Sequence, residues 1–147
     1  MTLKEIAVEE FTNFVKESPL GTYYQTREYA LLMGNYGYDY DFIGMYDEYS
    51  NLKAASLILI KKVRNLKYGY APRGFIIDYF NKELVTEFMC ELIKYYKKKK
   101  IPCNFLVEQI QYFEYIVRFF DTFQVHVMYI SYLHHLPIRE VYFLLEM

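Results

Sequence analysis

One arginine at mid-chain stands where a side chain could bind an anion. Arg73 lies between Pro72 and Gly74, and these two residues end any strand that runs in from Leu66. A strand end that breaks into a Pro-Arg-Gly turn displays one long cation on a rigid scaffold, as many binding sites do. Its guanidinium could grip a phosphate or a carboxylate with two parallel hydrogen bonds. The alternative is a structural arginine that donates to the carbonyls of its own turn.

Other residues that could do chemistry form weaker patterns. Asp78 follows the turn and is a second candidate for substrate binding, although it could instead serve the N-terminus of a helix capped by Asn81. His126, His134 and His135 have no acid or cysteine at a metal-ligand spacing, so we expect no metal. The sequence has no P-loop, GxSxG, HExxH or GxGxxG motif, and we expect no cofactor.

The composition limits the class of protein. A chain of 147 residues is long enough for one ordinary domain, and 54% hydrophobic residues can fill a sizeable core. The formal net charge of -1 gives no general attraction to nucleic acid or to membranes. Charged residues interrupt the N-terminus, so no signal peptide is visible. The longest apolar run, Ala54 to Ile60, is too short for a transmembrane segment. We therefore expect a cytoplasmic protein.

The spacing of apolar residues predicts the elements that position the turn. Helices are predicted over residues 8–17, 27–33 and 82–99, and strands over residues 40–46, 53–63, 67–71 and 103–108. Leu57 to Ile60 is apolar on both faces, which is typical of a central strand covered on both sides.

This order of elements indicates a particular layout. The first three strands form an antiparallel meander, and the long helix crosses over to place the last strand beside it. The layout is α+β, with packed helices on the mixed sheet of the acetyltransferase-like (GNAT) fold. We assign residues 1–108 to a single domain of this kind. Residues 109–147 are a divergent C-terminal extension that we expect to pack on the same domain.

The segment after the third strand differs from that of a coenzyme A enzyme. Acetyl-CoA enzymes of this layout cradle pyrophosphate with backbone N–H groups, and need a glycine-rich turn close to R-x-x-G-x-G/A before the helix. Here the segment from Arg73 to Asp78 has one glycine, then bulky residues, then an acid. This sequence argues against CoA binding, and a GNAT-type N-acyltransferase stays as an alternative.

Three short elements occur in a specific order along the first two thirds of the chain. They are QTREY from Gln25, GNYG from Gly34 and YAPRGF from Tyr70. The set resembles the Q-S-x-E-W, G-N-W-G and Y-A-P-R-G-P elements of the FemABX (MurM-like) peptidoglycan bridge-forming aminoacyltransferases, and the match covers about residues 9–106. Tyrosines replace both tryptophans, Phe75 replaces the last proline, and Met33 stands where many members carry a lysine for the diphosphate.

The resemblance implies an activity. Members transfer an amino acid from aminoacyl-tRNA to the peptide stem of a peptidoglycan precursor, which is a UDP-linked or lipid-linked muropeptide. They use two acetyltransferase-like units and neither CoA nor metal. On this view Arg73, Tyr70 and Gln25 line the precursor groove. The second unit has no counterpart in this sequence, which suggests a truncated aminoacyltransferase or one half of a two-chain enzyme in the cytoplasm or at the inner face of the membrane. A catalytically inactive binding module, in a homodimer, is the alternative.

The first prediction concerns the coenzyme. We expect acetyl-CoA to leave the melting temperature of the chain unchanged, because the segment after Arg73 lacks the glycines that admit a pyrophosphate. A ligand present at a hundred times its Kd would add about 2.7 kcal/mol of stability. Thermal denaturation with and without acetyl-CoA checks this, and a rise of several degrees would favour the N-acyltransferase.

Overall fold

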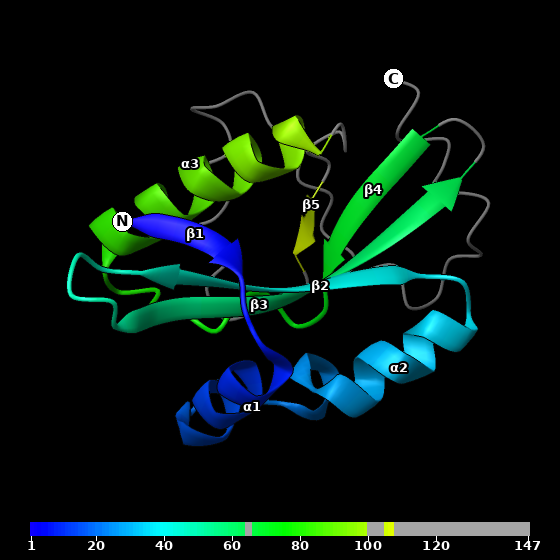
Figure 1. Ribbon diagram of the computed structural model, residues 1–147, viewed down its shortest axis with the longest axis horizontal. Coiled ribbons are helices and arrows are strands. Elements are labelled where there is room, and N and C mark those ends of the chain that lie inside the picture. The colour runs from blue at the N-terminus through cyan, green and yellow to red at the C-terminus, as the bar shows by residue number, and fades with distance from the viewer. Residues whose placement is uncertain (64–65, 100–104, 108–147) are drawn as a thin grey trace.

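A computed structural model describes residues 1–63, 66–99 and 105–107 of the chain. The elements in chain order are β1 (Thr2–Glu5), α1 (Val8–Glu17), the 3-10 turn η1 (Tyr23–Gln25), α2 (Arg27–Asn35), β2 (Asp39–Tyr46), β3 (Leu52–Val63), β4 (Leu66–Ala71), α3 (Lys82–Lys98) and β5 (Phe105–Val107). The strands form one five-stranded sheet in the order β1-β2-β3-β4-β5. All neighbours are antiparallel except β4 and β5, which are parallel. Helix α3 covers one face, and α1 and α2 cover the other (Figure 1). The predicted α+β fold of the acetyltransferase-like type is confirmed.

The central strand β3 divides the interior into two cores. Its residues alternate between the faces of the sheet, as a pleated strand requires. Ile58 and Ile60 point into the core under α3, whereas Leu57 and Leu59 point into the core under α1 and α2. Residues 54–60 are all buried. The predicted burial of this strand on both faces is therefore confirmed.

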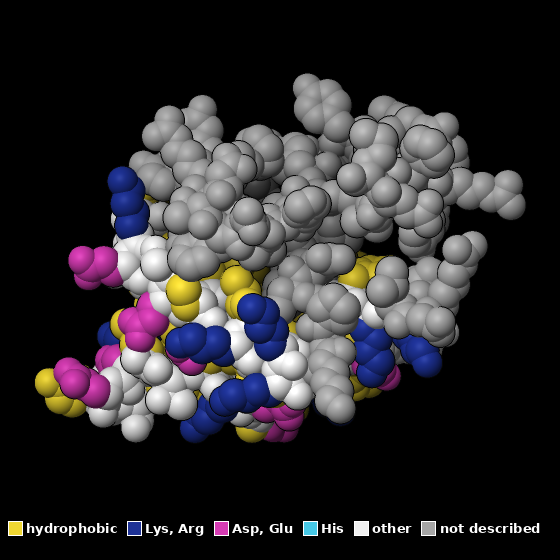
Figure 2. Space-filling view, turned by 90° about the horizontal axis from the view of Figure 1, so that it is seen from above, with side chains coloured by type: hydrophobic (Ala, Val, Ile, Leu, Met, Phe, Trp, Pro, Cys, Tyr) yellow, Lys and Arg dark blue, Asp and Glu magenta, His cyan; other side chains and the backbone are white. Residues whose placement is uncertain are grey.

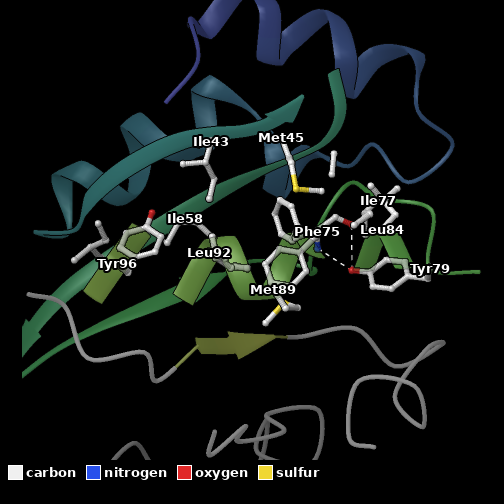
Figure 3. Packing of buried hydrophobic residues seen from close by; sticks show 14 residues of the cluster. Ile43, Met45, Ile58, Phe75, Ile77, Tyr79, Leu84, Met89, Leu92 and Tyr96 are labelled. Carbon is white, nitrogen blue, oxygen red and sulfur yellow. Dashed lines mark hydrogen bonds between the residues drawn. The ribbon is translucent and has the colours of Figure 1, made fainter. Parts of the chain in front are cut away.

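The core under α3 is the larger of the two. Phe88, Met89 and Leu92 lie on the stripe that the helical spacing predicts, and they pack against Ile43 and Phe75 from the other side (Figure 3). The rings of Phe75 and Phe88 meet edge to face, with centroids 5.0 Å apart. The segment after β4 therefore enters the core beside the helix.

Helix ends follow the capping residues in the sequence. The Thr26 side chain accepts a hydrogen bond from the Tyr29 N–H at the start of α2, and the Asn81 side chain accepts one from the Leu84 N–H at the start of α3. The cap at Asn81 was predicted. Helix α2 runs two residues past the predicted end, to Asn35.

Strand β1 is the element that the sequence did not predict. Its four residues carry one apolar side chain, Leu3, so they show no hydrophobic period. Pairing with β2 and the end of α3 hold it in place. Lys99 forms ion pairs with Glu5 of β1 and with Asp41 of β2. Burial alone would lower the pKa of Lys99, but the hydrogen bonds to these carboxylates outweigh it, so the pKa is raised. The Tyr96 hydroxyl donates to Asp41 at 2.9 Å.

Two expectations fall on other parts of the chain. Residues 64–65, which connect the predicted strands 53–63 and 67–71, and the C-terminal extension at residues 109–147 lie outside the described residues. On the side of the molecule that carries α3, positively and negatively charged side chains lie among one another on the described part of the surface (Figure 2). Among the helices that the structure describes, none has the length and apolar character needed to cross a bilayer.

The turn between β2 and β3 is held by one carboxylate. Asp47 accepts hydrogen bonds from the backbone N–H groups of Tyr49 and Asn51, at 2.9 and 2.8 Å, and from the Asn51 side chain at 3.0 Å. Lys53 lies 3.3 Å away. These bonds favour the ionised form, the Asn51 side chain most, and the pKa of Asp47 falls from its ordinary 3.8 to about 2.

This shift makes a prediction about acid. A folded-state pKa below 3.8 means that Asp47 stabilises the turn fully above that pH and loses its contribution as the pH falls towards about 2. The Asp47→Asn variant cannot titrate there. We expect wild type to lose more stability than this variant between pH 5 and pH 2, measured as urea midpoints by circular dichroism. A difference that stays constant with pH would contradict the role of the carboxylate.

Candidate functional site

The turn after β4 holds Arg73 in an uncommon backbone conformation. The Gly74 N–H donates to the Ala71 carbonyl at 3.1 Å, and Arg73 has φ of 60°. With Pro72 at the second position, these are the features of a type II turn, in which the third residue must be left-handed. Glycine or asparagine usually stands there, since a side chain costs roughly 1–2 kcal/mol in this region. The exposed arginine therefore carries backbone strain.

Gln25 from η1 holds this turn from inside the molecule. Its Nε2 donates to the Pro72 carbonyl at 2.5 Å and to the Gly74 carbonyl at 2.8 Å, and its Oε1 accepts from the Leu57 N–H at 2.7 Å. The residue is 1% exposed. Because two of its partners are carbonyls and one is an N–H, only one orientation of the amide satisfies them. The predicted contact of Gln25 with substrate stays a prediction, and the contact that the structure has is with the Arg73 turn.

An aromatic surface lies beside Arg73. The guanidinium carbon lies 5.1 Å from the centre of the Tyr24 ring, within cation–π range. Tyr24 packs edge to face against Tyr23 and Tyr29, with centroids 6.0 and 5.1 Å apart. Tyr23 is 57% exposed and Tyr24 is 39% exposed. The neighbours Tyr24 and Gln25 thus support Arg73 from the solvent side and from the core side.

The other two predicted site residues lie apart from this arrangement. Tyr70 is half-buried on β4 and packs against the core under α1 and α2. Asp78 is exposed, and its carboxylate accepts from the Phe80 N–H at 3.0 Å. It lines a surface hollow of about 340 Å³ that Arg73 does not line. The residues of this hollow are Phe14, Ser18, Pro19, Leu20, Lys53, Ile76, Ile77, Asp78, Tyr79 and Phe80. The structure therefore joins Gln25 to the Arg73 turn and places Asp78 in a separate hollow.

Five backbone N–H groups in the segment after Arg73 already have hydrogen-bond partners. The Phe75 N–H donates to the Tyr79 hydroxyl at 2.9 Å, and the Ile76 N–H donates to the Ala55 carbonyl at 2.9 Å (Figure 3 shows the first bond). The N–H groups of Gly74, Phe80 and Asn81 also have partners, within the segment or in Ala71. A pyrophosphate loop needs such groups unpaired. These five N–H groups are therefore not available to a pyrophosphate, and the expected lack of CoA binding stays a prediction.

The family of the chain follows from comparison with known proteins. The model of the FemAB family matches residues 6–108. The chain belongs to the FemAB family. The match includes the Arg73 turn, Gln25 and all of α3.

Three known proteins show what this chain is similar to and over what share of its length. The aminoacyltransferase FemA of Staphylococcus aureus is 34% identical over 101 residues, which are 68% of this chain and 24% of FemA. The chain thus spans about a quarter of the length of this relative. The crystal structure of FemX superposes with a TM-score of 0.67 at 23% identity, over 84% of this chain and 31% of FemX. A variant of the BH1408 protein from Bacillus halodurans gives a TM-score of 0.57 at 12% identity, over 94% of this chain and 99% of that protein. The two structures support the fold alone.

Sequence reasoning missed two contributors to the arrangement around Arg73. Tyr24 lies in an aromatic pair that has no helical or strand period, and Leu57 contributes a backbone N–H that no side-chain pattern records. Only the tyrosine had a visible signal, because it immediately precedes Gln25 in the first family element. Within the part of the chain that the structure describes, no three His, Cys, Asp or Glu residues gather as metal ligands. The three histidines lie outside that part.

The strain at Arg73 can be measured by substitution. Arg73→Gly and Arg73→Ala both remove the guanidinium and its contact with Tyr24, but only glycine adopts a positive φ without steric cost. We expect the glycine variant to be more stable than the alanine variant by roughly 1 kcal/mol, in spite of the greater freedom of glycine in the unfolded chain. Urea denaturation of the pair checks this. An alanine variant as stable as the glycine variant would show that position 73 is not left-handed in solution.

Proposed function

We propose that this chain is the precursor-binding unit of an aminoacyltransferase that transfers an amino acid from aminoacyl-tRNA to the peptide stem of a peptidoglycan precursor. The observation that carries the proposal is the exposed Arg73 guanidinium on a strained turn inside the FemAB match. Strain of this kind persists where a side chain is needed in one direction. The precursor would be a UDP-linked or lipid-linked muropeptide, and Arg73 would bind one of its phosphates or carboxylates.

The groups around the turn suit binding more than proton transfer. An arginine is always charged at neutral pH, so it can orient an anion and stabilise negative charge, but it cannot act as an acid or base. Two parallel N–H donors match the oxygens of a phosphate or carboxylate. The ring of Tyr24 restricts the guanidinium, which lowers the entropy lost on binding. In this proposal Tyr70 and Asp78, which lie apart from the Arg73 turn, contact other parts of the precursor.

A second candidate function is a binding module without chemistry. The observation that favours it is that the contacts of Tyr24 and Gln25 restrain a guanidinium and its turn, and a guanidinium binds anions without acting as an acid or base. A module of this kind would hold the precursor, or a partner chain that carries the remaining part of the enzyme, in the cytoplasm or at the inner face of the membrane. A homodimer is the other possible partner arrangement. Where the module holds the precursor, both candidates need Arg73 to bind it, and they then differ only in whether a product forms.

One experiment tests binding and separates the two candidates. We expect the full chain to bind a UDP-linked muropeptide and Arg73→Gly to weaken the binding about tenfold or more, since a charge-assisted hydrogen bond contributes roughly 1.5–3 kcal/mol. The glycine keeps the turn conformation. Lys16→Ala, which removes an exposed cation from α1, is the matched control and should bind within about twofold of wild type. Isothermal titration calorimetry gives the affinities.

Adding charged tRNA to the same mixture decides whether the chain is an enzyme. A branched muropeptide in the mass spectrum, from the chain alone or with a partner chain, supports the aminoacyltransferase. Precursor binding without a branched product supports the binding module. A wild-type chain that does not bind the muropeptide, or an Arg73→Gly variant that binds it as tightly as wild type, would refute the proposed role of Arg73.

A further inference from the structure

The ladder between β3 and β4 stops two residues before it could include the turn. Leu59 pairs with Tyr70, and the antiparallel register continues from there to the hairpin end. Carried two residues in the other direction, this register would place Leu57 opposite Pro72. The strands separate at that point, and the next contact along β3 is the bridge between Ala55 and Ile76. Residues 72–75 therefore bulge away from β3.

The carboxamide of Gln25 fills the gap that the separation leaves. Its oxygen accepts a hydrogen bond from the Leu57 N–H, and its nitrogen donates one to the Pro72 carbonyl. The amide therefore lies between two backbone groups that the ladder would have joined. A primary amide has the same donor and acceptor as a peptide group and one further N–H. That second N–H donates to the Gly74 carbonyl. Gln25 thus binds the backbone on both sides of Arg73.

This arrangement bears on the direction in which the Arg73 guanidinium points. The Gln25 nitrogen holds the carbonyl of the 72–73 peptide, which flanks residue 73 on one side, and the carbonyl of the 74–75 peptide, which lies one plane further on. The 73–74 peptide between them is held by the bond from the Gly74 N–H to the Ala71 carbonyl, so the peptide planes on both sides of residue 73 are restrained. We propose that Gln25 is a positioning residue for Arg73: its carboxamide replaces a rung of the β-ladder and holds the arginine in the left-handed conformation that presents the guanidinium to a ligand. The consequence for binding rests on the proposed function, whereas the conformational coupling does not.

The alternative is that Gln25 is a satisfied polar group in the core and nothing more. In that case Pro72 and Gly74 would impose the turn by themselves, and loss of the amide would lower stability without changing the conformation at position 73. A comparison of glycine with alanine at position 73 reports that conformation directly, because only a positive φ favours glycine over alanine.

The first test measures this comparison with and without the amide. Gln25→Met keeps the length of the side chain and removes its hydrogen bonds. With Gln25 present, we expect Arg73→Gly to melt about 3 °C above Arg73→Ala, and in the Gln25→Met background we expect the two to melt within about 1 °C of each other. The control background is Leu92→Val, a core change under α3, in which the gap of about 3 °C should persist. An equal gap in the Gln25→Met background would overturn the proposal.

The second test measures the consequence for binding. Inorganic pyrophosphate serves as the probe for an anion site, and calorimetry gives its Kd. We expect Gln25→Met to weaken pyrophosphate binding about fivefold or more and Leu92→Val to leave it within about twofold, because only the first change frees the turn. Wild-type affinity in Gln25→Met would overturn the positioning role. A wild-type chain that does not bind pyrophosphate argues against Arg73 as an anion site, and the melting comparison then decides the coupling by itself.

A second variant covers the case in which Gln25→Met does not fold. Gln25→Glu has an isosteric side chain, and its protonated form keeps the acceptor for Leu57 and one donor for Pro72 or Gly74. Burial next to carbonyls should raise the pKa of this carboxyl above its unfolded value of about 4.3. The glycine–alanine gap at position 73 should then be present at about pH 5 and shrink as the pH rises towards about 7, where the ionised form cannot donate. A gap that does not change with pH would overturn the proposal.

Discussion

The burial of β3 on both faces is the constraint on which the rest of the fold depends. Four consecutive apolar residues, Leu57 to Ile60, cannot all face one core, because alternate side chains of a strand point to opposite sides. The sheet must therefore be covered on both faces, and this places α3 on one side and α1 with α2 on the other. Every backbone polar group of such a strand also needs a partner, since water is excluded from both sides.

That second requirement creates the site. Strand β4 leaves β3 after Tyr70, and the Leu57 N–H would be buried without a partner if nothing replaced the ladder. A lost buried partner costs roughly 1–3 kcal/mol. Gln25 of η1 removes this cost, because its side chain accepts a hydrogen bond from the Leu57 N–H. The same side chain donates to the Gly74 carbonyl, which links the strand to the turn that carries Arg73. The same segment puts Tyr24 against the guanidinium. The need to satisfy the interior thus positions an exposed cation.

Local sequence patterns predicted most of the helices and strands, but they did not predict the contacts of the candidate site. The stripe on α3, the alternation along β3 and the caps at Thr26 and Asn81 are each encoded within a few residues, so they could be read directly. Arg73 was found because Pro72 and Gly74 flank it. The function of the Gln25 amide depends on backbone groups that lie 32 to 49 residues away in the sequence, and no spacing rule reports such a contact. Strand β1 was missed because tertiary contacts, including the Lys99 ion pairs, compensate for its weak propensity.

Arginine at position 73 has a cost in free energy that glycine would avoid. A turn that needed only its shape could use glycine there without steric cost, whereas arginine adds roughly 1–2 kcal/mol of strain and a long, flexible side chain to be ordered. The hydrogen bonds of Gln25 and the ring of Tyr24 offset both costs, one at the backbone and one at the guanidinium. The structure therefore stabilises a cation in a conformation that its backbone disfavours. Because the guanidinium does not release its proton at neutral pH, the role that we propose for it is the orientation of an anionic substrate.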